Sequence, residues 1–159
     1  MEQLCEIKGL RSAEIADGAL ALVLNNSLAA VEEGRIAISQ FLGPLDPMVQ
    51  NRLEVLFEEL VSNTVRHGFA ANSSQSIHVL VWRGPGAIRL TFEDDGLPFD
   101  PTKVDVAARM AVTDPAQLGG LGIPLIARLS SLFRYEPLSP GRACEGFRPR
   151  NRTIVSVNT

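Results

Sequence analysis

Residues 53–69 read Leu-Glu-Val-Leu-Phe-Glu-Glu-Leu-Val-Ser-Asn-Thr-Val-Arg-His-Gly-Phe. Within this stretch and just before it, side chains suited to burial recur at helical spacing: Val49, Leu53, Leu56, Phe57, Leu60 and Thr64. Asp46 can cap the start of such a helix, Pro47 suits its first position, and Gly68 supplies a stop. The stretch therefore predicts one amphipathic helix whose stripe faces the core.

A second face of this helix is polar. Glu59, Asn63 and His67 follow one another at intervals of four residues, so they stack beside the buried stripe. Arg66 lies alongside them, whereas Glu58 points to solvent. One interpretation is a solvated border with local hydrogen bonds. The other is a functional face, and the motifs that follow in the chain favour it.

Length and composition are those of an ordinary globular domain. The chain has 159 residues, 45% of them hydrophobic and 21% charged, with a net charge of −3. This balance argues against a broad nucleic-acid or membrane footprint. Neither a signal peptide nor an apolar run of about 20 residues is present, so we expect a cytoplasmic location. Cys5 and Cys144 lack metal-site spacing and are expected to be reduced thiols.

The remaining pattern predicts the order of the elements. Residues 1–18 are weakly patterned and are expected to form an N-terminal extension, followed by a single domain over 19–159. Within that domain the sequence predicts a strand over 19–24, a helix over 28–41 capped by Ser27, the central helix, a hairpin over 77–82 and 87–93, a lid over 102–118, a helix over 119–132, and strands over 132–135 and 152–157. This order predicts an α/β sandwich with a mostly antiparallel, mixed sheet covered on one face by helices.

The second strand of the hairpin runs into Asp94-Asp95-Gly96. By alternation, Asp94 continues the inward face formed by Ile88, Leu90 and Phe92. An inward carboxylate is costly unless it has a partner. Either it caps the turn through backbone amides, or it forms a pocket floor and accepts a hydrogen bond from a ligand amino group.

A cluster of glycines opens the next helix, in the run Gly119-Gly120-Leu121-Gly122-Ile123. Glycines at a helix N-terminus let backbone amides approach an anion, which the helix dipole also favours. A tight loop-to-helix turn is the alternative, because a lone glycine cluster is a weak signal.

Taken in order, the three motifs resemble those of the GHKL superfamily, whose fold is the Bergerat ATP-binding fold. Glu59 to Asn63 resembles the N box, Asp94-Asp95-Gly96 the first glycine box, and the run from Gly119 the second. The chain is most similar to the small anti-sigma regulatory factors of bacteria, which are serine-protein kinases. The run Asn63–Gly68, the run Asp95–Pro101 and the closing Asn-Arg-Thr at 151–153 carry this similarity. Pro98 replaces a glycine found in many superfamily members, and no Lys stands in the second glycine box.

The resemblance implies a role for each motif residue. Glu59 would act as general base on an acceptor hydroxyl, and Asn63 would give an oxygen ligand to Mg²⁺. The adenine would bind to Asp94, with Gly96 allowing close packing and Thr153 completing the contact. His67 would lie at the pocket edge, although a core histidine is equally consistent with the sequence. The phosphates would be bound by the backbone of the second glycine box, which comprises Gly119, Gly120, Leu121 and Gly122.

The function implied by this family is that of a probable ATP-dependent protein-serine kinase. Its substrate would be an anti-anti-sigma (STAS) protein, and it would sequester a sigma factor when that partner is phosphorylated. The alternative is a nucleotide-gated interaction module without kinase activity. Homodimerisation through Ile36, Ile38 and Phe41 is compatible with the sequence, although core packing explains these residues equally well. A sensor histidine kinase would need an upstream phosphoacceptor histidine, and no histidine precedes His67.

Overall fold

One sheet forms the framework of the domain. The computed structural model describes residues 10–16, 18–69, 74–105, 107–108, 122–139 and 147–159. Its strands are β1 (Leu10–Ala16), β2 (Ala19–Asn25), β3 (Ser76–Gly84), β4 (Ala87–Asp94), β5 (Leu132–Pro137) and β6 (Asn151–Asn158). They form a six-stranded sheet in the order β1-β2-β3-β4-β6-β5, and every described pairing is antiparallel.

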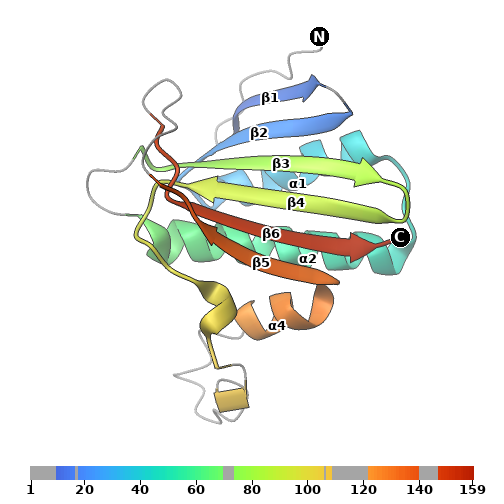
Figure 1. Cartoon of the computed structure of the whole chain (residues 1–159). Coiled ribbons are helices and arrows are strands. Elements are labelled where there is room, and N and C mark those ends of the chain that lie inside the picture. The colour runs from blue at the N-terminus through green and yellow to red at the C-terminus, as the bar shows by residue number, and fades with distance from the viewer. Residues whose placement is uncertain (1–9, 17, 70–73, 106, 109–121, 140–146) are drawn as a thin grey trace.

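Helices cover one face of this sheet (Figure 1). They are α1 (Ala29–Leu42), α2 (Pro47–Asn63) and the shorter α4 (Gly122–Leu129), which packs against α2. The predicted α/β sandwich is therefore confirmed. The short helix Pro101–Lys103 follows β4, and most of the predicted lid over 102–118 lies outside the described residues.

Alternation along the central strands builds the core between sheet and helices. Ile88, Leu90 and Phe92, the predicted inward residues of β4, are buried. The alternate residues Ile77, Val79 and Val81 of β3 are buried too, whereas Leu80 and Trp82 on the opposite face of β3 are 45% and 41% exposed. The buried hydrophobic set from β3, β4 and α2 comprises Ile77, Val79, Val81, Ile88, Leu90, Phe92, Leu53, Leu56, Phe57, Leu60 and Val61. Removing this apolar surface from water stabilises the packing of α2 on the sheet.

The start of the chain differs from expectation. Residues 1–18 are expected to form an extension, yet β1 pairs with β2 from Leu10↔Leu24 to Ala16↔Ala19. Gly18 has a positive φ of 74°, which glycine tolerates without steric cost. Residues 10–16 therefore belong to the sheet, and the expected boundary at residue 18 is wrong for them. An edge strand needs no strong apolar pattern, so composition concealed it.

The start of α2 is as predicted, because the side chain of Asp46 accepts a hydrogen bond from the amide of Met48 at 2.9 Å. The start of α1 is not. Its N-cap is Leu28, without a side-chain cap bond, and no donor or acceptor among the described residues contacts the buried hydroxyl of Ser27.

The end of the central helix also differs. The α-helical winding stops at Asn63, and Thr64–Gly68 forms a π-helical turn. The hydroxyl of Thr64 donates to the carbonyl of Leu60 at 2.9 Å, a side-chain bond of the kind that bends helices. A π turn closes bonds between residues five apart, so His67 does not continue the four-residue stacking of Glu59 and Asn63.

Candidate functional site

The polar face of α2 meets the first residue of α4. A Cβ atom placed on Gly122 would overlap Oε2 of Glu59 and would lie 3.2 Å from Nδ2 of Asn63. A side chain at position 122 would require the Glu59 carboxylate to move, so the N box and the last glycine of the second box lie against each other. Gly119, Gly120 and Leu121 lie outside the described residues.

The two adjacent glutamates of α2 differ as predicted. Glu59 is half-buried and Glu58 is exposed. Burial raises the pKa of Glu59, the charge of Glu58 raises it further, and the charge of Arg66 lowers it. A raised pKa moves a carboxyl group toward the range where it can accept and return a proton near neutrality.

Asp94 lies at the end of β4 and faces the helix-covered side. Its Oδ1 accepts hydrogen bonds from the amide of Gly96 and from Nδ2 of Asn151, both at 2.9 Å. Burial raises the pKa of Asp94, although these two donors oppose the rise. The carboxylate thus caps the turn, as one interpretation holds, through Oδ1 alone. Its Oδ2 has no donor among the described residues.

The first glycine box is joined to the π turn. A Cβ atom on Gly96 would overlap the carbonyl oxygen of Gly68, and the amide of Leu97 donates to that oxygen at 2.7 Å. The backbone therefore passes too close to the end of the N box for any side chain at position 96. This contact ties the face that carries Asn63 to the loop that carries Asp94.

Asp95 ties the same region to the start of β3. It is 9% exposed, and its Oδ2 accepts from the amide of Ser74 at 2.6 Å. Its Oδ1 is buried, with no donor among the described residues. A carboxylate oxygen buried in this way is costly, so a water or a ligand group is the natural partner.

Thr153 and His67 complete the predicted set. Thr153 pairs with Phe92 in β6, two residues along from the pair Asp94↔Asn151, so it shares the face that carries Asp94. His67 is exposed in the π turn, which excludes a core histidine. No described contact joins either residue to Asp94.

Two residues of this region are absent from the predicted set. Asn151 is 5% exposed and contacts Asp94, and the hydroxyl of Tyr135 donates to Oδ1 of Asn151 at 2.7 Å. The place of Asn151 at the start of the last strand was visible in the sequence. Its partnership with Asp94, 57 residues away, depends on the pairing of β4 with β6.

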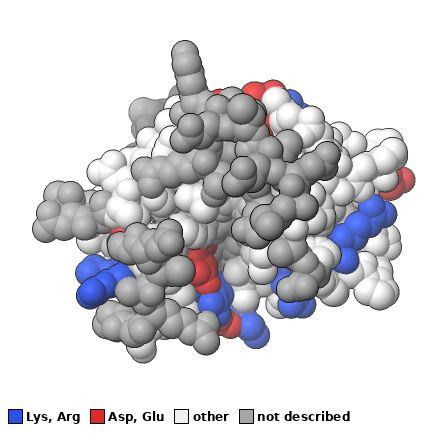
Figure 2. All heavy atoms as spheres, turned by 90° about the horizontal axis from the view of Figure 1, so that it is seen from above, with Lys and Arg blue, Asp and Glu red and all other residues white. Residues whose placement is uncertain are grey.

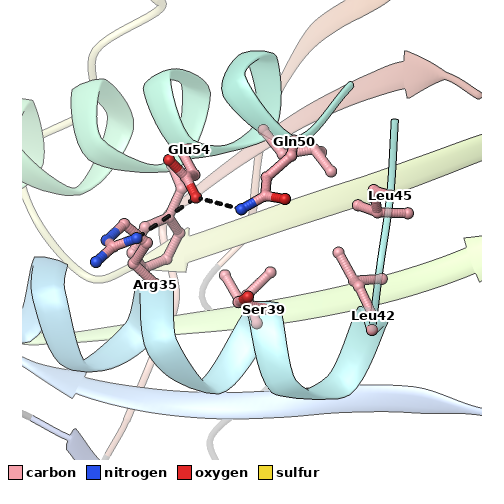
Figure 3. Close-up of a pocket in the computed structure, with 10 residues that line it drawn as sticks. Arg35, Ser39, Leu42, Leu45, Gln50 and Glu54 are labelled. Atoms are coloured by element: carbon pink, nitrogen blue, oxygen red, sulfur yellow. Dashed lines mark hydrogen bonds and ion pairs between the residues drawn. The ribbon is translucent and has the colours of Figure 1, made fainter. Parts of the chain in front are cut away.

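A crevice between α1 and α2 lies apart from this site (Figure 3). Its floor is apolar, and its rim groups already bond to each other. Oε1 of Glu54 accepts from Nε2 of Gln50 at 3.1 Å and from Nη1 of Arg35 at 3.4 Å. The crevice therefore presents little unsatisfied polar chemistry to a ligand.

On the face that Figure 2 shows, the charges of the described residues do not form one broad field. Figure 2 shows Lys and Arg side chains in small groups, some of them beside acidic side chains. Among the described residues, no cluster of three His, Cys, Asp or Glu side chains has a metal-binding arrangement. Nor does any helix in the described part of the chain have the length and apolar character to cross a membrane.

Comparison with protein families agrees with the geometry of the motifs. A model of the histidine kinase-like ATPase domain matches residues 24–144. The chain belongs to this family, which confirms the resemblance at the level of the GHKL superfamily. The protein is therefore an ATP-binding domain of the GHKL type. Comparison with curated protein sequences gives no significant match.

Proposed function

We propose that this protein is a protein-serine kinase of the anti-sigma regulatory type. It transfers the terminal phosphoryl group of ATP to a serine of an anti-anti-sigma (STAS) partner, and it sequesters a sigma factor when that partner is phosphorylated. The observation that supports the proposal best is the contact of Glu59 and Asn63 with Gly122 at the start of α4.

This contact brings together the groups that phosphoryl transfer requires. Such transfer depends on positioning and charge neutralisation more than on covalent chemistry by the protein. The helix start at Gly122 is suited to phosphate oxygens, because its amides and dipole point toward them. Glu59 lies beside that helix start with a raised pKa, so it is placed to orient an incoming serine hydroxyl and accept its proton.

Asn63 is the proposed ligand for Mg²⁺. The metal takes oxygen ligands, keeps several waters, and commonly uses one or two protein groups together with substrate phosphates. The side chain of Asn63 is half-buried beside the proposed phosphate site, and its carbonyl oxygen is the kind of ligand that this requirement needs. When bound, the metal would neutralise phosphate charge.

Labelled transfer provides the test. Purified protein with γ-labelled ATP and Mg²⁺ is added to lysate of the source organism, with Glu59→Gln and Asn63→Ala as variants. Glu58→Gln is the matched control, because it makes the same change at the exposed neighbouring position. We expect label on the serine of a small protein with the wild type and the control at neutral pH, and a loss of about 100-fold or more in Glu59→Gln.

Each other result has a definite meaning. Full transfer by Glu59→Gln would exclude Glu59 as the base. No transfer by wild-type protein that still binds ATP would favour the alternative, a nucleotide-gated interaction module. Partner capture with and without nucleotide would then identify what the module binds.

A further inference from the structure

The side chain of Asn151 makes several hydrogen bonds to the groups around Asp94. Its Nδ2 donates to Oδ1 of Asp94 at 2.9 Å, and also lies 3.1 Å from the carbonyl oxygen of Leu97 and 3.4 Å from that of Gly96. The residue is 5% exposed. One buried amide therefore contacts both the carboxylate and the backbone of the first glycine box.

The other end of the amide is fixed as well. Oδ1 of Asn151 accepts from the hydroxyl of Tyr135 at 2.7 Å and from the amide of Phe99 at 3.4 Å. Because Oδ1 faces these donors and Nδ2 faces only acceptors, every contact agrees on one orientation of the amide. Tyr135 on β5 thus helps to determine which end of Asn151 meets Asp94.

This arrangement has a consequence for the carboxylate. Two donors, Asn151 and the amide of Gly96, engage the same oxygen of Asp94, so they fix the plane of the group and leave Oδ2 without a donor among the described residues. Because the amide of Gly96 and Nδ2 of Asn151 both donate, Oδ1 of Asp94 acts as an acceptor. Oδ2 is then the atom that remains to accept a hydrogen bond from a ligand.

We propose that Asn151 is a positioning residue for nucleotide selection, which holds Asp94 so that Oδ2 accepts from the 6-amino group of adenine, and that Tyr135 fixes its orientation. The family match ends at residue 144, before β6 begins. The inference rests on the proposed role of Asp94 in adenine recognition.

The test compares two nucleotides that differ in one group. Calorimetry on the full chain gives the dissociation constants of ATP and of purine riboside triphosphate, which has hydrogen in place of the 6-amino group. We expect wild-type protein to prefer ATP by about tenfold, the preference that one good hydrogen bond provides. Asn151→Ala should reduce this preference to about threefold or less.

Two further variants separate positioning from packing. Asn151→Leu keeps roughly the size of the side chain but has neither donor nor acceptor, so it should lose the preference as the alanine variant does. Tyr135→Phe should lower the preference less. Ser156→Ala is the matched control, because Ser156 lies on the same strand as Asn151. The change removes a buried hydroxyl that contacts Ser131 and should keep the full preference.

Asp94→Ala distinguishes failure of this inference from failure of its premise. If Asp94→Ala abolishes the preference while Asn151→Leu and Tyr135→Phe keep it, Asn151 does not position the carboxylate. If Asp94→Ala keeps the preference, the role of Asp94 is wrong and the inference falls with it. Should Asn151→Ala not fold, Tyr135→Phe and Asn151→Leu still decide the result.

Discussion

Glu58 and Glu59 are neighbours in sequence with different chemistry. The helical spacing predicts this difference, and burial of Glu59 beside Gly122 gives it a physical cause. Because a base must be ionised to act, phosphotransfer should rise with pH through the raised pKa of Glu59 and fall on the acid side.

Two substitutions should move that acid limb in opposite directions. Glu58→Gln removes a charge that raises the pKa of Glu59, so the limb should move to lower pH. Arg66→Gln removes a charge that lowers it, so the limb should move to higher pH. Single-turnover transfer at saturating nucleotide, measured across pH, provides the check. An acid limb that neither variant moves would mean that another group controls it.

Asp94 should lower the stability of the folded protein when it is ionised. Its folded pKa is raised by burial, so the free energy of unfolding falls as pH rises from the unfolded pKa, about 3.9, through the folded value. Asp94→Asn removes this ionisation. Relative to wild type, the variant should gain roughly 2–4 °C in Tm at neutral pH, the effect of about 1 kcal/mol, and little at pH 3.

The same variant should bind ATP more weakly, because an amide hydrogen would then face the adenine amino group. A substitution that stabilises the folded protein while it weakens ligand binding is common at functional sites. An equal Tm difference at both pH values would show that the ionisation of Asp94 does not carry the effect.

At the scale of elements, the join between the π turn and the first glycine box aligns the two halves of the site. Gly96→Ala would place a methyl group on the carbonyl oxygen of Gly68 and should cost about 2 kcal/mol or more in the free energy of unfolding. Nucleotide affinity should fall with it. Denaturant unfolding and calorimetry measure the two effects.

Gly68→Ala is the matched control for that change. It keeps the carbonyl that Leu97 contacts, and its Cβ would meet only the side chain of Thr64, at 3.0 Å. It should therefore be milder in both measurements. If the two variants behaved alike, the backbone contact at Gly96 would not be the element that aligns the site.

The sequence predicted the elements in which hydrophobic residues recur with a clear helical or strand period. It missed the elements without such a period. The stripe of α2 and the alternation of β3 and β4 are consequences of burial, so they are visible in the residue pattern. The edge strand β1 has no strong apolar pattern, but the dipeptide Asp17-Gly18 was a hairpin signal that could have revealed it. The π turn depends on tertiary contacts such as that between Gly68 and Gly96, which no local pattern records.

At the scale of the molecule, the candidate site draws on α2, β4, α4 and β6, which are distant in sequence. Antiparallel pairing of β4 with β6 brings Asn151 to Asp94, and packing of α4 on α2 brings Gly122 to Glu59. The motifs could be predicted one by one because each has its own residue signature. Their supporting contacts could not, because these follow from strand order.

A ligand that contacts all four elements should stabilise the domain as a whole. With nucleotide at 100 times its dissociation constant, mass action adds about 2.7 kcal/mol, which corresponds to roughly 5–10 °C in Tm for a domain of this size. We expect this shift with Mg·ADP, and a smaller one with ADP and a chelator. Asp94→Ala at the same nucleotide concentration should show roughly half of it, since a tenfold weaker site gains about 1.4 kcal/mol. Ser156→Ala should keep it, since Ser156 lies on β6 away from Asp94.

Hydrogen exchange should show protection by nucleotide at the ends of α2 and β4 and at the start of α4. Protection confined to one of these elements would mean that they do not form a single nucleotide site.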